Sequence, residues 1–297
     1  MNVTVIEDPF VAHRGLLFTV SYEMLGSAAD AEDVVQETWL RWDAIGEEAR
    51  AAVRDPRAFL VRMVTRKALD RLRSAARRRE EYVGEWLPEP LLTAPDVADD
   101  VELAESVSFA MLTVLETLTP TERAVFVLRE VFDMSYGEIA EVIGKSVAAV
   151  RQIGHRARGH VAARRPRMEV SRGEQQEAVE RFLAAVTDGD LQGLLDVLAP
   201  DVVLVADGGG VVQALINPVV GAKKVANLLR PFSRLAPGAE ILPLPLNGGV
   251  GARIVGTDDG YDTAISFVVD GGRISRIYAV RNPAKLGRID VETAISR

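Results

Sequence analysis

The segment 134–158 constrains this chain most, because it reads as two short helices around a tight turn. Apolar side chains recur every three or four residues in the first helix, at Tyr136, Ile139, Ala140 and Ile143. Gly144 follows where the chain must turn, and Ser146 is placed to cap the next helix. The pattern predicts a helical hairpin of defined geometry.

The second helix of this segment has an apolar face and a basic face. The apolar face carries Val150, Ile153, Ala157 and Val161, and the basic face carries Arg151, His155 and Arg158. A helix that packs on one side and offers Arg, Gln and His on the other can enter a DNA major groove. We therefore predict a DNA-binding helix–turn–helix. On this motif alone, a helical hairpin with a solvated basic face remains an alternative.

The net charge of −8 hides a strong division along the chain. The segment 41–79 has 12 Lys and Arg against 5 acids, and 145–167 has 7 Lys and Arg with no acid. Between them, 80–119 has 10 acids and neither Lys nor Arg. This division predicts two basic modules that attract phosphate, joined by an acidic linker.

Composition favours a cytoplasmic protein. The chain has no cysteine, which excludes disulfides and Cys-based zinc sites. We see no signal-peptide pattern and no apolar run of the roughly 20 residues that a membrane span needs. We expect no cofactor, no metal and no membrane contact.

The pattern changes at about residue 166. Before it, 9–79 and about 101–163 read as helical, and the proline-rich stretch 86–95 should contain no regular structure. After it, 174–198 reads as one or two helices. Strand-like runs follow at 202–205, 250–256, 264–269 and 274–280, with a hairpin turn at 270–272. Helices followed by antiparallel strands predict a separate α+β domain.

Two sets of residues resemble the extracytoplasmic-function sigma factors. The segments Asp30–Trp42, Asp55–Leu60 and Leu69–Arg73 resemble sigma region 2, and Leu118–Arg158 resembles region 4. Three further segments resemble the SigJ-like subgroup, which carries a fused SnoaL-like domain with the fold of nuclear transport factor two. They are Trp86–Pro90, Asp207–Gly210 and Asn282–Leu286. Val211 and Ala284 stand where that subgroup has a basic and an acidic residue, so no salt bridge is expected from them.

The resemblance implies a multidomain fold. It has two all-α sigma modules, a region 2 helical bundle and a region 4 helix–turn–helix, followed by a C-terminal α+β SnoaL-like domain. The expected ranges are 1–80 for region 2, 81–103 for the acidic linker, 104–167 for region 4 and 173–297 for the SnoaL-like domain.

The resemblance also implies two partners, core RNA polymerase and promoter DNA. The acidic face expected to bind core polymerase comprises Asp30, Asp33, Gln36 and Glu37, although a solvated helix face is the commoner reason for such charges. The residues expected at DNA are Arg62, Arg66, Arg71, Arg73, Arg77, Arg78, Ser146, Arg151, Gln152, His155, Arg156 and Arg158. Arg66 replaces an Asn that is usual in the family, so the downstream promoter sequence does not carry over.

The three subgroup segments imply docking between the linker and the C-terminal domain. The residues expected there are Trp86, Leu87, Pro88, Glu89, Pro90, Asp207, Gly208, Gly209, Gly210, Asn282, Pro283, Lys285 and Leu286. We expect Trp86 to pack on the domain and Lys285 to offer its charge to a linker acid such as Glu89. On composition alone, the linker acids could equally form a disordered tether or mimic a nucleic-acid backbone.

Three classes of function follow from these observations. The first is a sigma factor that directs core polymerase to promoters and is regulated in cis by the SnoaL-like domain. The second is a DNA-binding regulator whose C-terminal domain binds or converts a small apolar ligand. The third is a repressor that works without polymerase. No His or Cys follows residue 160, so we expect no enzyme, and we interpret Asp207 as a turn residue rather than a base.

Overall fold

The computed structural model describes residues 8–94, 97, 100–164, 171–256 and 262–297, with the side chains of 76–80 outside the described part. The chain divides into two compact units. One unit contains Met1–Arg78, Val114–Arg164 and Ala294–Arg297, and the other contains Arg79–Thr113 and Arg165–Thr293. No helix within the described ranges is long and apolar enough to cross a membrane.

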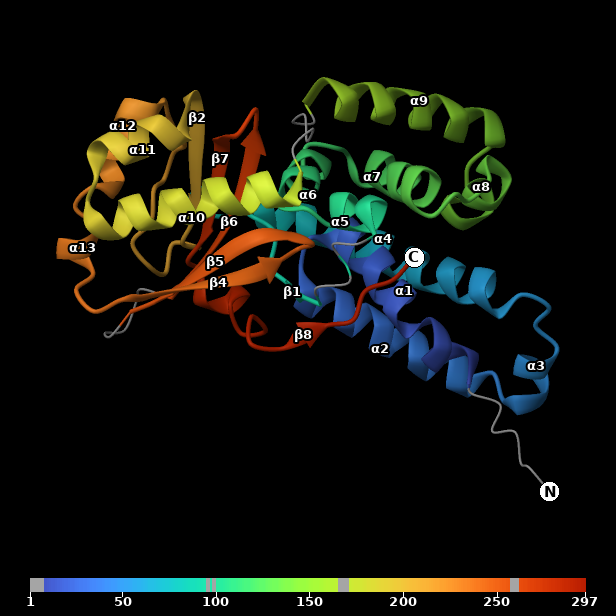
Figure 1. Ribbon diagram of the computed structural model, residues 1–297. Coiled ribbons are helices and arrows are strands. Elements are labelled where there is room, and N and C mark those ends of the chain that lie inside the picture. The colour runs from blue at the N-terminus through green and yellow to red at the C-terminus, as the bar shows by residue number, and fades with distance from the viewer. Residues whose placement is uncertain (1–7, 95–96, 98–99, 165–170, 257–261) are drawn as a thin grey trace. The chain divides into compact units, whose positions relative to one another are not determined.

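The first unit begins with a helical bundle. Its helices are α1 (Pro9–Leu25), α2 (Ala28–Ala44), α3 (Glu47–Ala51) and α4 (Pro56–Glu80) (Figure 1). The side chain of Asp8 caps α1, and Ser27 caps α2 by accepting a hydrogen bond from a backbone N–H of its first turn. Trp42, Tyr22 and Phe18 are completely buried or nearly so, and they fill the core of the bundle.

The same unit contains the predicted helix–turn–helix, which is formed by α8 (Tyr136–Ile143) and α9 (Val147–Arg164). It is preceded by α7 (Pro120–Phe126) and the π-helical turn η2 (Val127–Val131). Reciprocal capping boxes begin α7 and α8. Gly144 ends α8 with a φ of 68°, a left-handed conformation that strains other residues. The packed face of α9 is the predicted one, since Val150, Ala157 and Val161 are buried.

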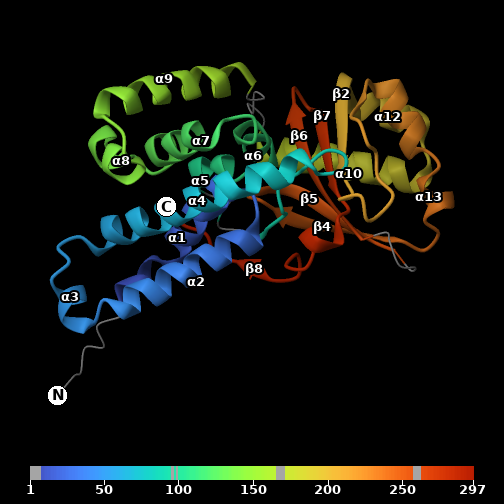
Figure 2. The same ribbon diagram turned by 180° about the vertical axis from the view of Figure 1, so that it is seen from behind.

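The second unit is an α+β domain built on an eight-stranded sheet. The strands are β1 (Leu92–Thr93), β2 (Leu198–Asp207), β3 (Val219–Val220), β4 (Glu240–Leu246), β5 (Gly249–Val255), β6 (Thr263–Asp270), β7 (Arg273–Val280) and β8 (Glu292–Thr293). Their order is β3-β2-β7-β6-β5-β4-β1-β8. Figure 2 shows the long strands from behind.

The two faces of this sheet are covered by different parts of the chain. The helices α10 (Arg172–Asp188), α11 (Leu191–Val197), α12 (Ala222–Leu229) and α13 (Phe232–Leu235) gather on one face, where they share an apolar cluster with the strands (Figure 1). The other face packs against earlier parts of the chain, including Leu87 of the linker and Phe109 of α6 (Phe109–Leu115). A short helix, α5 (Val101–Ser106), precedes α6, and η3 (Pro283–Lys285) follows β7. The expected fold class is confirmed.

Three details differ from the sequence-based expectation. The strand β4 was not predicted, because Pro243 and Pro245 lie in it. The two prolines are two residues apart, so both lack an N–H on the same side of the strand. β5 pairs along all of β4 in spite of them. The proline-rich stretch contains the two-residue strand β1, which pairs with β8 and with Leu246 of β4. Finally, β2 pairs with β7 in parallel, whereas we expected antiparallel strands only.

We predict that the first unit depends on the buried guanidinium of Arg123. This side chain is 1% exposed, forms an ion pair with Glu116, and donates to the Glu23 carbonyl oxygen at 2.8 Å. Arg123→Leu would leave the Glu116 carboxylate, which is 14% exposed, without its cation. We expect a loss of about 3 kcal/mol in the free energy of unfolding, measured by urea denaturation.

The matched control for this prediction is Arg73→Leu. The ion pair of Arg73 with Asp70 is largely exposed, so this variant should change the free energy by less than about 0.5 kcal/mol. Equal losses in the two variants would contradict the assignment.

Candidate nucleic-acid interface and linker-docking site

The exposed side of α9 presents the residues predicted to contact DNA. Arg151, Gln152, His155, Arg156 and Arg158 are all exposed, on the side opposite the buried apolar positions. The hydroxyl of Ser146 accepts a hydrogen bond from the Ala149 amide at 3.2 Å, so this side chain caps α9. The structure therefore gives Ser146 a helix-capping contact and leaves the other five side chains on one accessible face.

The tyrosine of α8 lies beside two of these arginines. The Arg158 guanidinium donates to the Tyr136 hydroxyl at 3.3 Å, and the Arg151 guanidinium lies 6.0 Å from the centre of its ring. Gly154 of α9 lies against the same ring, where an added Cβ would come within 3.3 Å. Tyr136 thus orders the basic face of α9 from behind, a contact we did not predict.

In region 2, residues from the two predicted interfaces form ion pairs with each other. Arg71 of α4, predicted at DNA, is 2.6 Å from both Asp30 and Asp33 of α2, predicted at polymerase. Lys67 is 2.7 Å from Glu37, and this hydrogen bond lowers the pKa of the Glu37 carboxyl. The acidic face of α2 is therefore in part neutralised by α4.

The remaining region 2 candidates lie along α2 and α4. Gln36 and Arg73 are exposed, Arg62 is half-buried, and the exposed Arg66 donates to the Glu141 carbonyl oxygen at 3.2 Å. The side chains of Arg77 and Arg78 lie outside the described part.

In the second unit, the carboxylate of Asp207 binds the linker. Asp207 ends β2 and is completely buried. Its oxygens accept hydrogen bonds from the Tyr82 hydroxyl at 2.5 Å, the Leu87 amide at 2.9 Å and the Gly209 amide at 3.0 Å. Lys285 completes the set with an ion pair at 2.7 Å. Burial and the hydrogen bond to Asp207 raise the pKa of Tyr82.

Lys285 connects this carboxylate to the tryptophan of the linker. Its ammonium lies 3.9 Å from the centre of the Trp86 ring and 5.0 Å from that of Tyr82. It also donates to the Leu87 carbonyl oxygen at 2.6 Å. A cation held between two aromatic faces and a carboxylate is strongly favoured when water is excluded, and Lys285 is only 11% exposed.

The glycines after Asp207 allow the linker to approach closely. An added Cβ at Gly209 would lie 2.3 Å from the Asn282 side-chain nitrogen, which itself donates to the Tyr82 hydroxyl at 2.8 Å. An added Cβ at Gly210 would lie 3.0 Å from that of Val83. Both glycines have positive φ, so any other residue here would be strained as well as crowded.

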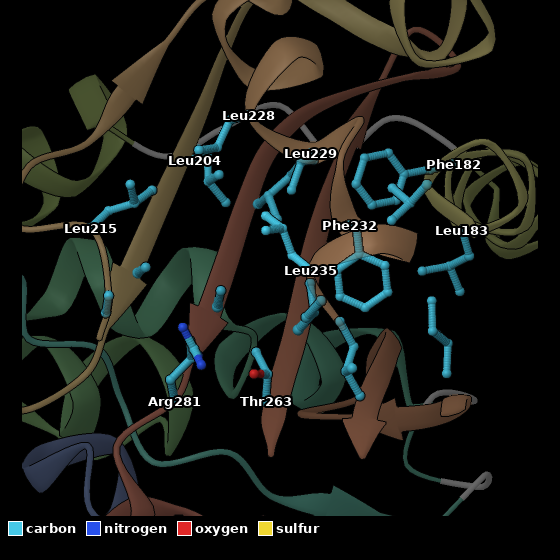
Figure 3. Close-up of a pocket in the computed structure, with 18 of the residues that line it drawn as sticks. Phe182, Leu183, Leu204, Leu215, Leu228, Leu229, Phe232, Leu235, Thr263 and Arg281 are labelled. Atoms are coloured by element: carbon cyan, nitrogen blue, oxygen red, sulfur yellow. The ribbon is translucent and has the colours of Figure 1, made fainter. Parts of the chain in front are cut away.

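The opposite face of the sheet lines a cavity of about 350 Å³. Its walls come from β2, β5, β6 and β7 on one side and from α10, α12 and α13 on the other. Figure 3 shows Phe182, Leu229 and Phe232 in its apolar part, with Arg281 and Thr263 toward one end. The side chains that the structure describes in this lining include no carboxylate, imidazole or thiol.

Comparison with known proteins accounts for both units. Residues 10–78 match the family Sigma-70 region 2, and 108–161 match Sigma-70, region 4. The chain is 40% identical over 290 residues to the ECF RNA polymerase sigma factor SigJ of Mycobacterium tuberculosis, covering 93% of this chain and 91% of that protein. The chain belongs to the extracytoplasmic-function sigma factors.

Two further comparisons extend the match. A probable ECF sigma factor SigI of M. tuberculosis is 32% identical over 288 residues, covering 95% of this chain and 94% of that one. The crystal structure of M. tuberculosis SigJ superposes with a TM-score of 0.77 at 34% identity, covering 95% and 99% of the two chains. The chain is thus a sigma factor for promoter-specific transcription initiation. The matches to SigJ and SigI cover 93% and 95% of this chain, so they include its C-terminal domain.

The structure brings together all three subgroup segments of this sigma factor. The side chains of Leu87, Pro88, Glu89 and Pro90 are buried and Trp86 is half-buried. On the domain, Asn282 and Leu286 are buried, whereas Pro283 is exposed. Gly208 is buried as well, and an added Cβ there would lie 2.6 Å from the Val212 carbonyl oxygen.

Other residues of this docking site were missed from the sequence. Tyr82 and Val83 precede the tryptophan motif, and nothing in their spacing marked them. Asn247 at the β4–β5 turn was missed too, although its side chain accepts from the Leu91 amide and donates to the Val107 carbonyl oxygen, both at 2.9 Å. An Asn before glycines reads as a turn signal, and that signal does not reveal its long-range partners.

Asp207 was interpreted as a turn residue, and its carboxylate does accept a hydrogen bond from the Gly209 amide two residues later, as in an Asx turn. The same carboxylate also binds the Tyr82 hydroxyl and the Leu87 amide of the linker, at the docking site expected for it. We predict that Asp207→Asn destabilises the second unit by about 3 kcal/mol in urea unfolding, because Lys285 loses its counter-ion and an amide nitrogen meets hydrogen-bond donors.

Asp201→Asn is the matched control, since Asp201 is an exposed residue of the same strand. It should change the free energy by less than about 0.5 kcal/mol. If Asp207→Asn is as harmless as this control, the carboxylate does not hold the linker.

Proposed function

We propose that the C-terminal domain regulates this sigma factor in cis by holding the linker between regions 2 and 4. The observation that carries the proposal is the buried Asp207 carboxylate, which binds Tyr82 and the Leu87 amide of the linker. If it were extended and free, the linker 81–103 could span roughly 70 Å. A linker bound to the C-terminal domain spans much less, so the domain limits the distances between region 2 and region 4.

The partners we propose are core RNA polymerase and promoter DNA, in the cytoplasm. Arg71 forms ion pairs with Asp30 and Asp33, so polymerase can bind these two carboxylates only if it displaces Arg71. A basic surface of polymerase that binds α2 would compete with Arg71 for these carboxylates. The released Arg71 would then be available to DNA phosphates, which links the two binding events.

We propose a binding role, rather than catalysis, for the C-terminal domain. Acid–base chemistry needs a titratable group that reaches the bound molecule. Among the described cavity-lining residues none is His, Cys, Asp or Glu, and Asp207 lies on the other face of the sheet. The presence of an apolar cavity nevertheless favours one second candidate, a regulator that responds to a small ligand.

The test of regulation in cis is run-off transcription with core polymerase and a promoter. Trp86→Ala removes the aromatic face below Lys285, and Asp207→Asn removes its counter-ion. Both variants undock the linker, so we expect both to change transcript yield severalfold and in the same direction. Binding to core polymerase should stay unchanged.

Two matched controls make this test specific. Trp86→Phe retains an aromatic face for Lys285, and Asp201→Asn makes the same charge change on the surface, so both should transcribe like the parent. Parent-like transcription from Trp86→Ala and Asp207→Asn, with the linker shown to be undocked by limited proteolysis, would refute regulation through docking.

Promoter reading by α9 is tested with matched and mismatched upstream elements. Arg151→Ala should cost about 1–3 kcal/mol of binding on the matched element and much less on the mismatched one, since a bidentate base contact is lost. Arg164→Ala, at the exposed end of α9, should weaken both elements equally and reduce the salt dependence. Equal losses for Arg151→Ala would reassign Arg151 to a phosphate contact.

A further inference from the structure

The cavity of the C-terminal domain has the composition of a small-molecule site. Its volume of about 350 Å³ lies at the lower end of the about 300–1,000 Å³ that such sites occupy. Apolar side chains from α10, α12, α13 and the sheet form most of the wall. Arg281 is the one ionised side chain among the described lining residues, and Thr263 and Gln213 supply the other polar side chains.

Arg281 is held at one end of this cavity by the sheet. The β6–β7 register pairs Ala264 with Val280, and its continuation places Thr263 opposite Arg281. The guanidinium donates to the Gln213 carbonyl oxygen, and the Arg281 backbone N–H donates to the Asp207 carbonyl oxygen at 2.7 Å. Figure 3 shows the Arg281 and Thr263 side chains near each other, away from Phe182.

A neighbouring hollow also borders Arg281, and the acidic residues that line it form ion pairs with a different arginine. Asp262 and Asp290 line that hollow. Both form ion pairs with Arg253, which lies 2.8 Å from Asp262. Arg253 balances one of the two negative charges of these acids and holds both carboxylates in ion pairs.

We propose that this cavity binds a small carboxylate with an apolar body, with the carboxylate at Arg281 and the body among Phe182, Leu229 and Phe232. A guanidinium matches a carboxylate by two parallel hydrogen bonds, which a hydroxyl or an amide does not reproduce. The Thr263 hydroxyl can donate to the same head group. The apolar body of the ligand would bury the apolar side chains of the cavity wall, which favours binding.

A ligand in the cavity also affects the linker, because the cavity and the docking site both border the end of β7. Arg281 faces the cavity, and the next residue, Asn282, donates to the Tyr82 hydroxyl of the linker. Both backbone N–H groups donate to the Asp207 carbonyl oxygen, at 2.7 and 2.9 Å. A ligand that shifts Arg281 therefore shifts a group that binds the linker. This coupling rests on the proposed function, whereas the binding site itself does not.

Calorimetric titration of the full chain with decanoate and with decan-1-ol tests the site. The two probes share an apolar body and differ in head group. We expect decanoate to bind about tenfold or more tightly than the alcohol, because charge-assisted hydrogen bonds form only with the carboxylate. Arg281→Gln should remove this difference, and Arg273→Gln, which changes the exposed arginine at the start of β7, should retain it.

Equal affinities of the parent for the two probes, or no binding of decanoate, would overturn the site, and neither result depends on how a variant folds. Unchanged decanoate affinity in Arg281→Gln would overturn the role of Arg281. Hydrogen exchange of the 82–91 segment tests the coupling, and we expect saturating decanoate to change its rate severalfold. An unchanged rate would overturn the coupling alone. Regulation in cis fails separately, through parent-like transcription of Trp86→Ala.

Discussion

A buried carboxylate must keep its partners, and this constraint on Asp207 organises the second unit. Removing a carboxylate from water costs several kcal/mol unless hydrogen bonds and an opposite charge replace the solvent. Asp207 meets that requirement with a lysine, a phenol and two backbone amides. The phenol and one of the amides belong to the linker. If the linker undocked, the Asp207 carboxylate would lose two hydrogen bonds and would be either exposed to water or buried with too few partners. The docked arrangement is therefore specific as well as stable.

The alternation of side chains along β7 gives this unit two functional faces. Ile277 and Ala279 face the cavity, as does Arg281 immediately after the strand, while Tyr278 and Val280 pack with the linker side of the sheet. A strand with one face toward solvent cannot connect two such sites. β7 lies between β2 and β6 in the sheet and is hydrogen-bonded to both. The linker and the cavity thus border the same strand.

The sequence predicted the helices well because their signals are local. Gly144, Ser146 and the buried positions of α9 act within a few residues, through capping and spacing. The two modules and the docking segments also followed from the sequence, through their resemblance to a family. Strand β4 was missed because its prolines argue against a strand. Its pairing with β5 depends on residues outside that segment.

The contacts of the docking site were less predictable than its segments. Lys285 was expected to approach a linker acid, but its ion pair with Asp207 and its place over Trp86 depend on partners far away in the sequence. Tyr82 and Arg281 lack any motif of their own. Their roles come from strand register and burial, which local sequence does not encode.

A double-mutant cycle between Tyr82→Phe and Asp207→Asn tests the central claim that this carboxylate holds the linker. The quantity to measure is the opening free energy of the 82–91 segment, from native-state hydrogen exchange of the parent, both single variants and the double variant. A direct hydrogen bond in a buried site predicts a coupling energy of about 1 kcal/mol or more. Losses that add without coupling would contradict the account, because Tyr82 and Asp207 would then stabilise the linker independently.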